Sequence, residues 1–211
     1  MLFGDLSNGP AADAARAAVR SLDNFNWTFI FCFAVVVIMY VNELKNKNYK
    51  VIFAALALYS VHWFYEIMNA IICATTGYAL WTVSADSTSF ILLIGVSWEL
   101  SMMFAIAGFL CKLLPENPKM KILGIPNRIA FAIGNALLFA VIEIFLAASP
   151  AFIWVYPWWG AIPVFITTYI PFFLACFLIY DAKPKTQMLF VGILAGVNIL
   201  LLAILVPLGI I

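Results

Sequence analysis

Three glutamates and the single histidine of this 211-residue chain lie inside strongly apolar segments. They are Glu66, Glu99, Glu143 and His62, and the ranges in which they lie, residues 51–111 and 129–182, contain no lysine or arginine. A charged side chain at the centre of a bilayer costs at least about 2.5 kcal/mol, so such groups without a cationic partner need a reason. We interpret these four side chains as a functional cluster that handles protons.

The spacing around His62 indicates a helix with one polar face. His62 and Glu66 are four residues apart, and Tyr59, Asn69 and Cys73 fall on the same face at about 100° per residue. The opposite face is apolar and can contact lipid. Since polar side chains in a membrane face the bundle interior or a cavity, this polar stripe predicts an internal pocket.

Depth estimates bring the other two glutamates to the same layer of the membrane. A helical rise of about 1.5 Å per residue places Glu66, Glu99 and Glu143 between the midplane and the outer third of a core about 30 Å thick. Tyr169 and Asn198 fall near the same depth. We therefore expect Glu99 and Glu143 to face the polar stripe.

Carboxyl groups gathered in one buried site favour acid–base chemistry. A neutral carboxylic acid beside an ionised one is the pairing that such catalysis uses. We predict Glu66 or Glu99 as the general acid, and His62 or Glu143 as the group that takes or relays the proton. The structural alternative is that each side chain is a hydrogen-bonding contact between helices. One histidine supplies too few nitrogen ligands for most zinc, iron or haem sites, so we expect no metal and no cofactor.

The segment WVYPWWG, residues 154–160, is dense in aromatic residues. An aromatic belt at the membrane interface is the favoured interpretation. The alternative is that the segment roofs a pocket, where aromatic faces would stabilise positive charge on a substrate. The candidate substrate-binding residues are Asn69, Trp98, Trp154, Tyr156, Trp158, Tyr169 and Asn198.

The elements that must position these side chains are transmembrane helices. The chain is 66% hydrophobic and 10% charged, whereas a soluble domain is about 25% charged. Six apolar segments approach the roughly 20 residues that a span requires. They are residues 26–43, 51–74, 89–113, 128–149, 160–181 and 187–210. We predict an all-α polytopic membrane bundle of about six transmembrane helices, and the net charge of +1 argues against nucleic acid as a partner.

The first 25 residues differ in character from residues 26–211, which form a single transmembrane bundle. Asp13, Arg16 and Arg20 recur every three or four residues on one face, while alanines fill the other face. This pattern is typical of an amphipathic helix that lies in the membrane interface.

The distribution of basic residues predicts how the bundle is oriented. Nine of the eleven lysines and arginines lie in the loops after the first, third and fifth apolar segments. Because cytoplasmic loops carry the excess of such residues, we expect a multi-pass protein with both termini on the non-cytoplasmic side.

The H-x-x-x-E pattern of His62 and Glu66, followed by Glu99, resembles the emopamil-binding sterol isomerase (EXPERA) family. The segment YIPFFLACFLIYDAK, residues 169–183, is similar to the last span of that family. The resemblance implies a membrane pocket in which a histidine and glutamates move a proton and shift a double bond of a sterol.

The sequence also departs from that family. It has Val164 and Thr167 where the family carries asparagine and tryptophan before the proline, and it adds a sixth span. The pair Trp98–Glu99 on a span resembles, in addition, the membrane-bound terpene cyclases of meroterpenoid pathways. Both resemblances imply protonation of an isoprenoid-type substrate within aromatic walls.

The function predicted from the sequence is a membrane-embedded acid–base enzyme of isomerase or cyclase type. Its substrate would be an isoprenoid- or sterol-like small molecule drawn from the membrane lipids. The alternative is a non-enzymatic subunit that packs against partner membrane subunits in a larger complex, or a proton- or cation-coupled carrier.

Overall fold

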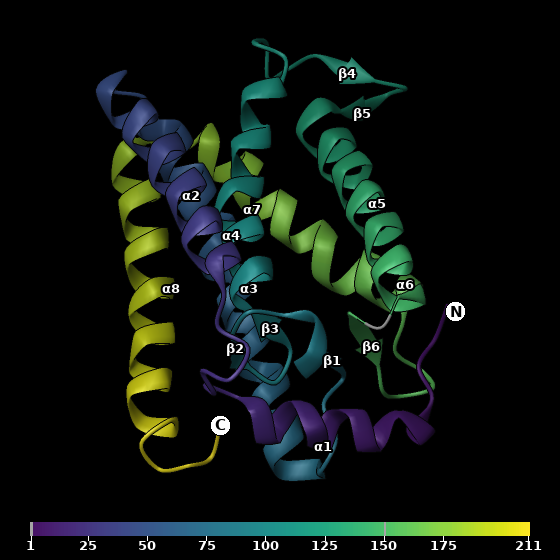
Figure 1. Cartoon of the computed structure of the whole chain (residues 1–211). Helices are drawn as coiled ribbons and strands as arrows, with labels where there is room; N and C mark the ends of the chain where they lie inside the picture. The colour runs from purple at the N-terminus through teal and green to yellow at the C-terminus, as the bar shows by residue number, and fades with distance from the viewer. Residues whose placement is uncertain (1, 150) are drawn as a thin grey trace.

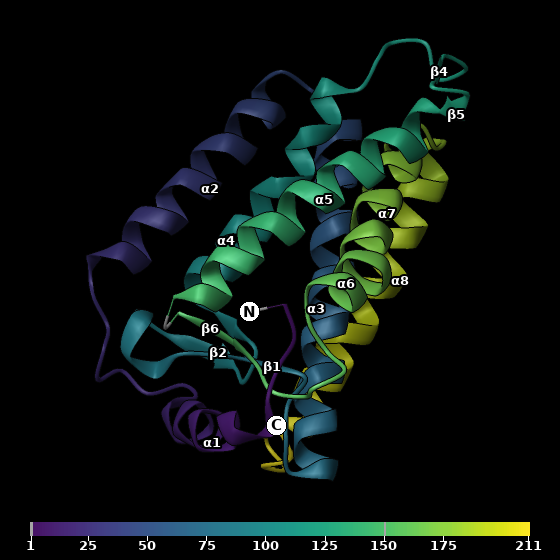
Figure 2. The same ribbon diagram turned by 90° about the vertical axis from the view of Figure 1, so that its right-hand side faces the viewer.

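The computed structural model describes residues 2–149 and 151–211. Within these residues, five helical segments are long and apolar enough to span a membrane. They are α2 (Trp27–Lys45), α3 (Tyr49–Thr76), α5 (Asn127–Ala148), Ala161–Tyr180 and α8 (Pro184–Leu205). This arrangement confirms the predicted all-α polytopic bundle, whose helices run between two ends with small strands (Figures 1 and 2).

The third apolar segment differs from the single helix expected over residues 89–113. Its first part forms a hairpin of β2 (Ile91–Leu93) and β3 (Val96–Ser97), and a helix begins only with α4 (Trp98–Ala107). A 3₁₀ segment over Gly108–Leu113 continues α4. The expectation is wrong for the residues before Trp98, because a buried apolar run suits a hairpin as well as a helix. Ser97 then caps α4, since its hydroxyl oxygen accepts from the amide of Leu100.

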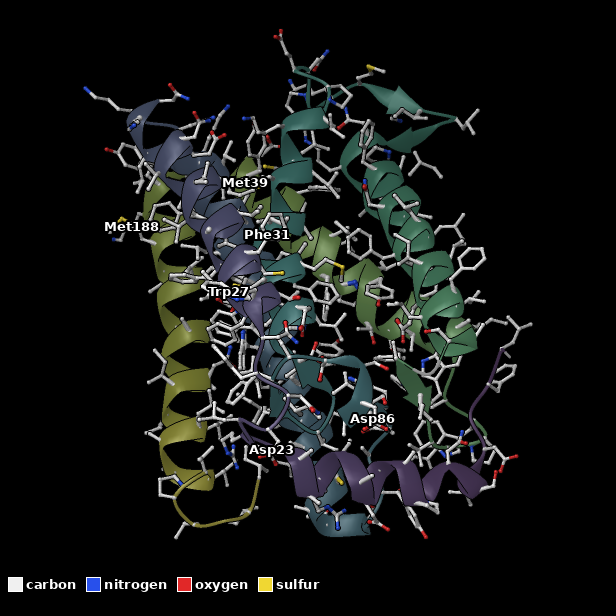
Figure 3. All side chains as sticks on the ribbon, viewed as in Figure 1. Asp23, Trp27, Phe31, Met39, Asp86 and Met188 are labelled. Carbon is white, nitrogen blue, oxygen red and sulfur yellow. The ribbon has the colours of Figure 1, made fainter. Side chains whose placement is uncertain are left out.

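Helix α3 lies at the centre of the bundle and packs against α4, α7 (Ile170–Tyr180) and α8. Small side chains allow a close approach to the 3₁₀ segment. A Cβ atom on Gly108 would lie only 2.3 Å from the Cα atom of Ala55, so glycine is required there. The outer faces of α2 and α8 are apolar, with Trp27, Phe31 and Met188 exposed as a lipid-facing surface requires (Figure 3).

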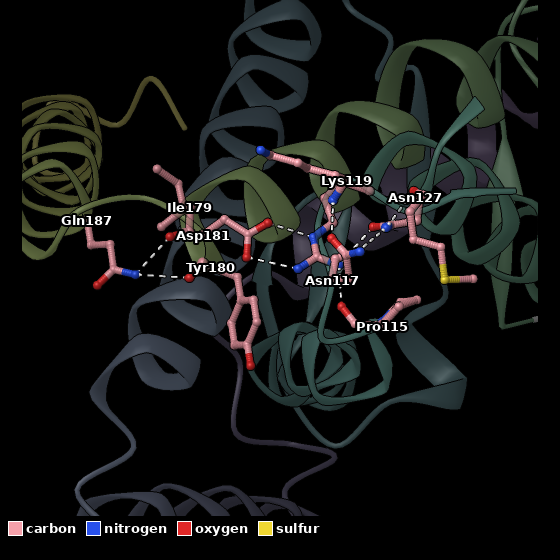
Figure 4. Close-up of polar contacts among 10 residues, drawn as sticks. Pro115, Asn117, Lys119, Asn127, Ile179, Tyr180, Asp181 and Gln187 are labelled. Atoms are coloured by element: carbon pink, nitrogen blue, oxygen red, sulfur yellow. Dashed lines mark hydrogen bonds and ion pairs between the residues drawn. The ribbon is translucent and has the colours of Figure 1, made fainter. Parts of the chain in front are cut away.

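One end of the bundle, here called the lysine end, carries the β4 (Lys121–Ile122) and β5 (Ile125–Pro126) hairpin. Two ion pairs join helices at this end. The Lys112 ammonium lies 2.5 Å from a carboxylate oxygen of Glu43. The Arg128 guanidinium donates to both carboxylate oxygens of Asp181, at 2.6 and 2.9 Å (Figure 4). The Glu43 and Asp181 carboxylates at this end are therefore each neutralised by a basic side chain.

The opposite end, here called the tryptophan end, is built from β1 (Trp81–Val83), β6 (Phe152–Trp154) and α1 (Gly9–Ala18). Strands β1 and β6 pair antiparallel, with Trp81 directly opposite Trp154. Helix α1 lies across this end in both views (Figures 1 and 2). Its alanine face packs against β1, and Ala12 and Ala15 are fully buried. The predicted N-terminal helix is present, and its placement in a membrane interface stays a prediction.

The first residues of the chain are joined to a segment far along the sequence. The amide of Gly4 donates to the carbonyl oxygen of Trp159, and the amide of Ala161 donates to that of Leu2. The side-chain amide of Asn8 donates to the carbonyl oxygen of Trp154 across a separation of 146 residues. These bonds close the tryptophan end around the loop that precedes α6 (Ala161–Val164).

Candidate functional site

A mainly apolar cavity lies within the bundle, beside the strands of the tryptophan end. It is lined from α3 by His62 and Glu66, from α5 by Glu143, and from the segment before α7 by Thr168 and Tyr169. About 40 Å³ is open to the centre of a water molecule. This volume exceeds the 10–15 Å³ that one water needs, and larger ligands require side chains to move apart.

The polar stripe of α3 faces this cavity, as the sequence predicts. His62 is 1% exposed and Glu66 is 5% exposed. The Nε2 atom of His62 lies 3.4 Å from Oε1 of Glu66, but the geometry does not form a hydrogen bond. The other oxygen of Glu66 accepts a hydrogen bond from the indole Nε1 of Trp81 at 3.2 Å.

Glu143 reaches the same cavity from α5 and is held by two neutral donors. Its Oε1 atom accepts from the indole Nε1 of Trp154 at 2.7 Å. Its Oε2 atom accepts from the phenolic hydroxyl of Tyr169. The expectation that Glu143 faces the polar stripe of α3 is confirmed, since Glu66 and Glu143 line one cavity.

The β1–β6 ladder explains why both carboxyl groups receive an indole. Residues directly opposite in an antiparallel pair carry their side chains on the same face. Trp81 and Trp154 are such a pair, and each donates to a different glutamate, Glu66 or Glu143. The sequence analysis missed Trp81 as a site residue, because nothing local in an apolar chain predicts this strand register.

Asn69 supports the site from behind instead of lining the cavity. Its side-chain oxygen accepts from the amide of Leu80 at 2.8 Å, and its Nδ2 donates to the carbonyl oxygen of Trp81 at 2.9 Å. Gly95 closes over the same place. A Cβ atom there would lie 2.5 Å from the indole nitrogen of Trp81 and 2.7 Å from Oε2 of Glu66. Only glycine leaves room for this contact.

A π-helical turn over Phe165–Tyr169 presents Thr168 and Tyr169 to the cavity. Pro171 has no amide hydrogen, so it cannot donate to the carbonyl group four residues earlier. That carbonyl belongs to Thr167, and the Tyr65 hydroxyl donates to it at 2.7 Å. A π-turn of this kind is frequent at functional sites.

Glu99 lies outside the cavity, so the expectation that it faces the polar stripe is wrong. Both the amide and the hydroxyl of Ser89 donate to Oε1 of Glu99, at 2.8 and 2.5 Å. The hairpin before α4 puts Glu99 in the first helical turn, in a polar depression that Asn24 and Asp86 also line. A carboxylate is favoured at that position by the helix dipole.

Two of the predicted tryptophans also lie away from the cavity. The indole of Trp98 donates to the carbonyl oxygen of Phe29 at 2.9 Å and stacks on the Phe29 ring. Trp158 is 59% exposed, as an interfacial aromatic residue would be. Trp154 donates to Glu143 but does not line the cavity, so the pocket-roof interpretation of WVYPWWG fits neither tryptophan.

Tyr156 and Asn198 make contacts elsewhere in the fold. The Tyr156 hydroxyl lies 2.9 Å from the hydroxyl of Thr76, near the end of α3. The side-chain amide of Asn198 donates to the carbonyl oxygen of Ser60 at 2.7 Å and joins α8 to α3. Both residues lie outside the lining of the cavity. Asn198 is expected at the same membrane depth as the glutamates. It does not reach the cavity, because α8 packs on the other side of α3.

The walls of the cavity are aromatic and apolar. Phe104, Phe139 and Phe172 surround Tyr169, with ring centroids between 5.8 and 6.2 Å from its ring. The His62 ring stacks on Phe104 at 4.2 Å. Rings arranged in this way can stabilise a positive charge formed between them.

One side of the cavity is lined by residues of α4 and α5 that are partly exposed on the bundle. Leu100 and Met103 line it from α4, and Ile142 and Leu146 line it from α5. Ile142 is 38% exposed, and the other three are half-buried. In Figure 1, α7 passes behind the space between these two helices. A lipophilic molecule would meet only apolar side chains along this side.

The ionisable side chains that line the cavity are Glu66, Glu143, His62 and Tyr169. Within residues 2–149 and 151–211, no lysine or arginine lines the cavity. The same residues contain no group of three or more histidine, cysteine, aspartate or glutamate side chains placed to hold a metal ion.

Comparisons with known proteins place the chain in a family. A family model described as an uncharacterized membrane protein family matches residues 9–207. The chain belongs to this family. An uncharacterized protein of Archaeoglobus fulgidus is 40% identical over 198 residues, which cover 91% of this chain and 94% of that protein. No solved structure matches the chain. Family membership and five candidate spans together make the protein a multi-pass integral membrane protein.

Proposed function

We propose that the protein is a membrane-embedded enzyme that moves a proton on a lipophilic, isoprenoid- or sterol-like substrate, as an isomerase or cyclase does. One observation carries this proposal. Glu66, Glu143 and His62 share an apolar cavity whose described lining contains no cation. Ionisable side chains within a membrane are by default candidates for a functional site, and these have neither a lysine nor an arginine beside them.

The proposed step needs no redox partner and no cofactor. One carboxyl group transfers its proton to a carbon of a substrate double bond, and a carbocation forms on the neighbouring carbon. The second carboxylate then removes a proton from an adjacent carbon, so the double bond shifts and the substrate keeps its composition. A proton passing back between Glu66 and Glu143, with His62 as relay, restores the starting state.

The surroundings of the two glutamates suit this division of work. Glu66 and Glu143 each accept one indole hydrogen bond, and Glu143 accepts a second bond from a phenol. Such neutral donors orient a carboxyl group without the permanent charge that a lysine would bring. The rings of Phe104 and Phe172 face the space where the carbocation would form.

The substrate would enter from the lipid between α4 and α5, where the cavity wall is apolar. Membrane lipids are then both the surroundings and the source of the substrate. The positive-inside rule supports a cytoplasmic location for the lysine end, which would put the cavity nearer the non-cytoplasmic side.

Solvent deuterium tests the proposal directly. Purified wild-type protein is incubated in D₂O with a lipid extract of its host, and the lipids are analysed by mass spectrometry. Wild type should add deuterium to one lipophilic species, whereas Glu66→Gln and Glu143→Gln should not. Glu99→Gln is the matched control, because that carboxyl lies outside the cavity, and it should behave as wild type.

Two results would count against the enzyme. If all three variants incorporate as much deuterium as wild type, neither Glu66 nor Glu143 takes part in the proton transfer. No incorporation by wild type, with the same bulk phospholipids bound to every variant, would favour the alternatives. The alternatives are a subunit of a larger membrane complex and a proton- or cation-coupled carrier. Partner chains that copurify after gentle detergent extraction would favour the subunit over the carrier.

A further inference from the structure

We propose that the cavity has a hydroxyl subsite, formed by His62 and Thr168, and that its ligand is a membrane-soluble alcohol. This inference rests on the proposed function for its location and adds the chemical class of the ligand. The hydroxyl group would lie between the two side chains, and the hydrocarbon part would extend toward the lipid between α4 and α5.

The first support is that both side chains are buried and form no hydrogen bond within the described residues. Oε1 of Glu66, 3.4 Å from Nε2 of His62, lies outside hydrogen-bond geometry. His62 is 1% exposed and Thr168 is 6% exposed. Among the described residues, neither ring nitrogen of His62 nor the hydroxyl of Thr168 has a hydrogen-bonding partner. Buried polar atoms in native proteins are nearly always satisfied, so a ligand group is expected to meet these atoms.

The second support is that the two residues face one space. Both line the same cavity. Phe172 connects them, because its ring centroid is 6.0 Å from that of His62 and it follows Thr168 by one helical turn. The π-turn turns Thr168 inward, while its neighbour Thr167 is exposed and donates to the carbonyl oxygen of Pro163 instead.

Hydrogen-bond chemistry selects an alcohol among lipophilic ligands. A neutral imidazole offers one donor and one acceptor, and a threonine hydroxyl offers both. An alcohol oxygen can donate to one of these groups and accept from the other, which satisfies both. An aldehyde or ketone oxygen can accept from both groups but cannot donate to the acceptor nitrogen of the imidazole, and a hydrocarbon does neither, so each leaves that buried nitrogen unpaired.

Three matched probes test the subsite: farnesol, farnesal and farnesene, which share an isoprenoid chain and differ in the terminal oxygen. Purified protein in lipid nanodiscs is titrated with each, and binding is followed by tryptophan fluorescence, since Trp81 lines the cavity. Affinities are expressed as mole fractions of lipid, so that partitioning does not enter. Wild type should bind farnesol about tenfold more tightly than farnesene, with farnesal between them.

Two variants remove one polar group each and keep the shape of the side chain. Thr168→Val and His62→Phe, which keeps an aromatic ring on Phe104, should each reduce the preference for farnesol to within about twofold. Thr167→Val is the control and should keep the wild-type preference. If His62→Phe fails to fold, as its melting curve would show, Thr168→Val decides alone.

The outcomes separate this inference from the proposed function. Equal binding of farnesol and farnesene by wild type, or no binding of either, overturns the subsite, and the two groups then bind water. A preference that survives in both variants also overturns it. Deuterium incorporation without an alcohol preference leaves the enzyme standing, whereas an alcohol preference without incorporation leaves a lipid-alcohol binding protein.

Discussion

The lysine end and the tryptophan end of the bundle treat their carboxyl groups in opposite ways. At the lysine end, Glu43 lies against Lys112 and Asp181 lies against Arg128. Beside the tryptophan end, Glu66 and Glu143 accept hydrogen bonds from indoles and a phenol, and no lysine or arginine lines their cavity. The same residue types are thus ion-pair partners in one place and uncompensated acids in the other.

This difference indicates which carboxyl groups are free to exchange a proton. Protonating a carboxylate that pairs with a buried cation leaves that cation without a partner, which costs several kcal/mol. A carboxyl group held by neutral donors carries no such penalty. The ion pairs therefore support the fold, and the cavity glutamates are available for chemistry. Four predictions test this division.

The largest expected effect is the loss of product when a cavity carboxyl becomes an amide. General acid–base groups contribute about 10²–10⁴-fold to a rate, so Glu66→Gln or Glu143→Gln should lower deuterium incorporation by that factor. The melting temperature should change little, because an amide oxygen still accepts the indole hydrogen bond. If the variants lose activity only because they unfold, as a lowered melting temperature would show, these glutamates are structural, like the carboxylates of the lysine end.

Breaking the bidentate Arg128–Asp181 pair at the lysine end should lower stability and leave activity unchanged. Arg128 is 6% exposed, and Arg128→Met leaves Asp181 without its partner and removes the link between α5 and α7. Because the Asp181 side chain is 33% exposed, loss of this bidentate pair should cost about 1.5–3 kcal/mol of unfolding free energy. Activity per folded molecule should stay at the wild-type level. Denaturation in mixed micelles measures the unfolding free energy. A lowered rate of deuterium incorporation per folded molecule would contradict the separation of structural from catalytic carboxyl groups.

Trp81→Phe removes the hydrogen bond to Glu66 but keeps an aromatic ring beneath it. A hydrogen bond to a charged group contributes about 1.5–3 kcal/mol, so a carboxyl that loses it should be misplaced and react roughly tenfold more slowly. Trp98→Phe is the control, because that indole bonds the carbonyl oxygen of Phe29 outside the cavity. Initial rates of deuterium incorporation compare the two, and equal rates would show that the indole of Trp81 does not position Glu66.

The smallest effect is expected at the half-exposed ion pair. The side chain of Lys112 is 47% exposed, so water screens its attraction to Glu43. Glu43→Gln leaves only the half-exposed Lys112 ammonium without its partner, so it should lower the unfolding free energy by no more than about 1 kcal/mol. The same denaturation series measures it beside Arg128→Met. If this variant loses as much unfolding free energy as Arg128→Met, solvent exposure does not determine the relative stabilities of the two ion pairs.

The sequence predicts the parts of the fold that are fixed locally. Apolar length and the positions of lysines locate α2, α3, α5 and α8, because a span must satisfy its own backbone. The face of α3 that carries His62 and Glu66 also follows from helical spacing alone. These two residues reach the cavity as expected.

The remaining features depend on contacts between distant parts of the chain. The apolar run before Trp98 gives no local sign that it forms a hairpin, and this hairpin moves Glu99 out of the expected layer. The pairing of Trp81 with Trp154 joins strands on either side of two helices. Such a register is decided by tertiary packing, which residue spacing does not report.

The bonds between the first residues and the loop before α6 bear on how the chain is made. Asn8 is separated from Trp154 by 146 residues, so its partner leaves the ribosome long after it does. At about 5–20 residues per second, the delay is roughly 7–30 s. In the second half of that interval α1 and β1 have been synthesised while β6 has not. Assembly of the cavity thus waits for β6 and for the segment after it, which supplies Thr168 and Tyr169, so Glu66 is made well before these neighbours.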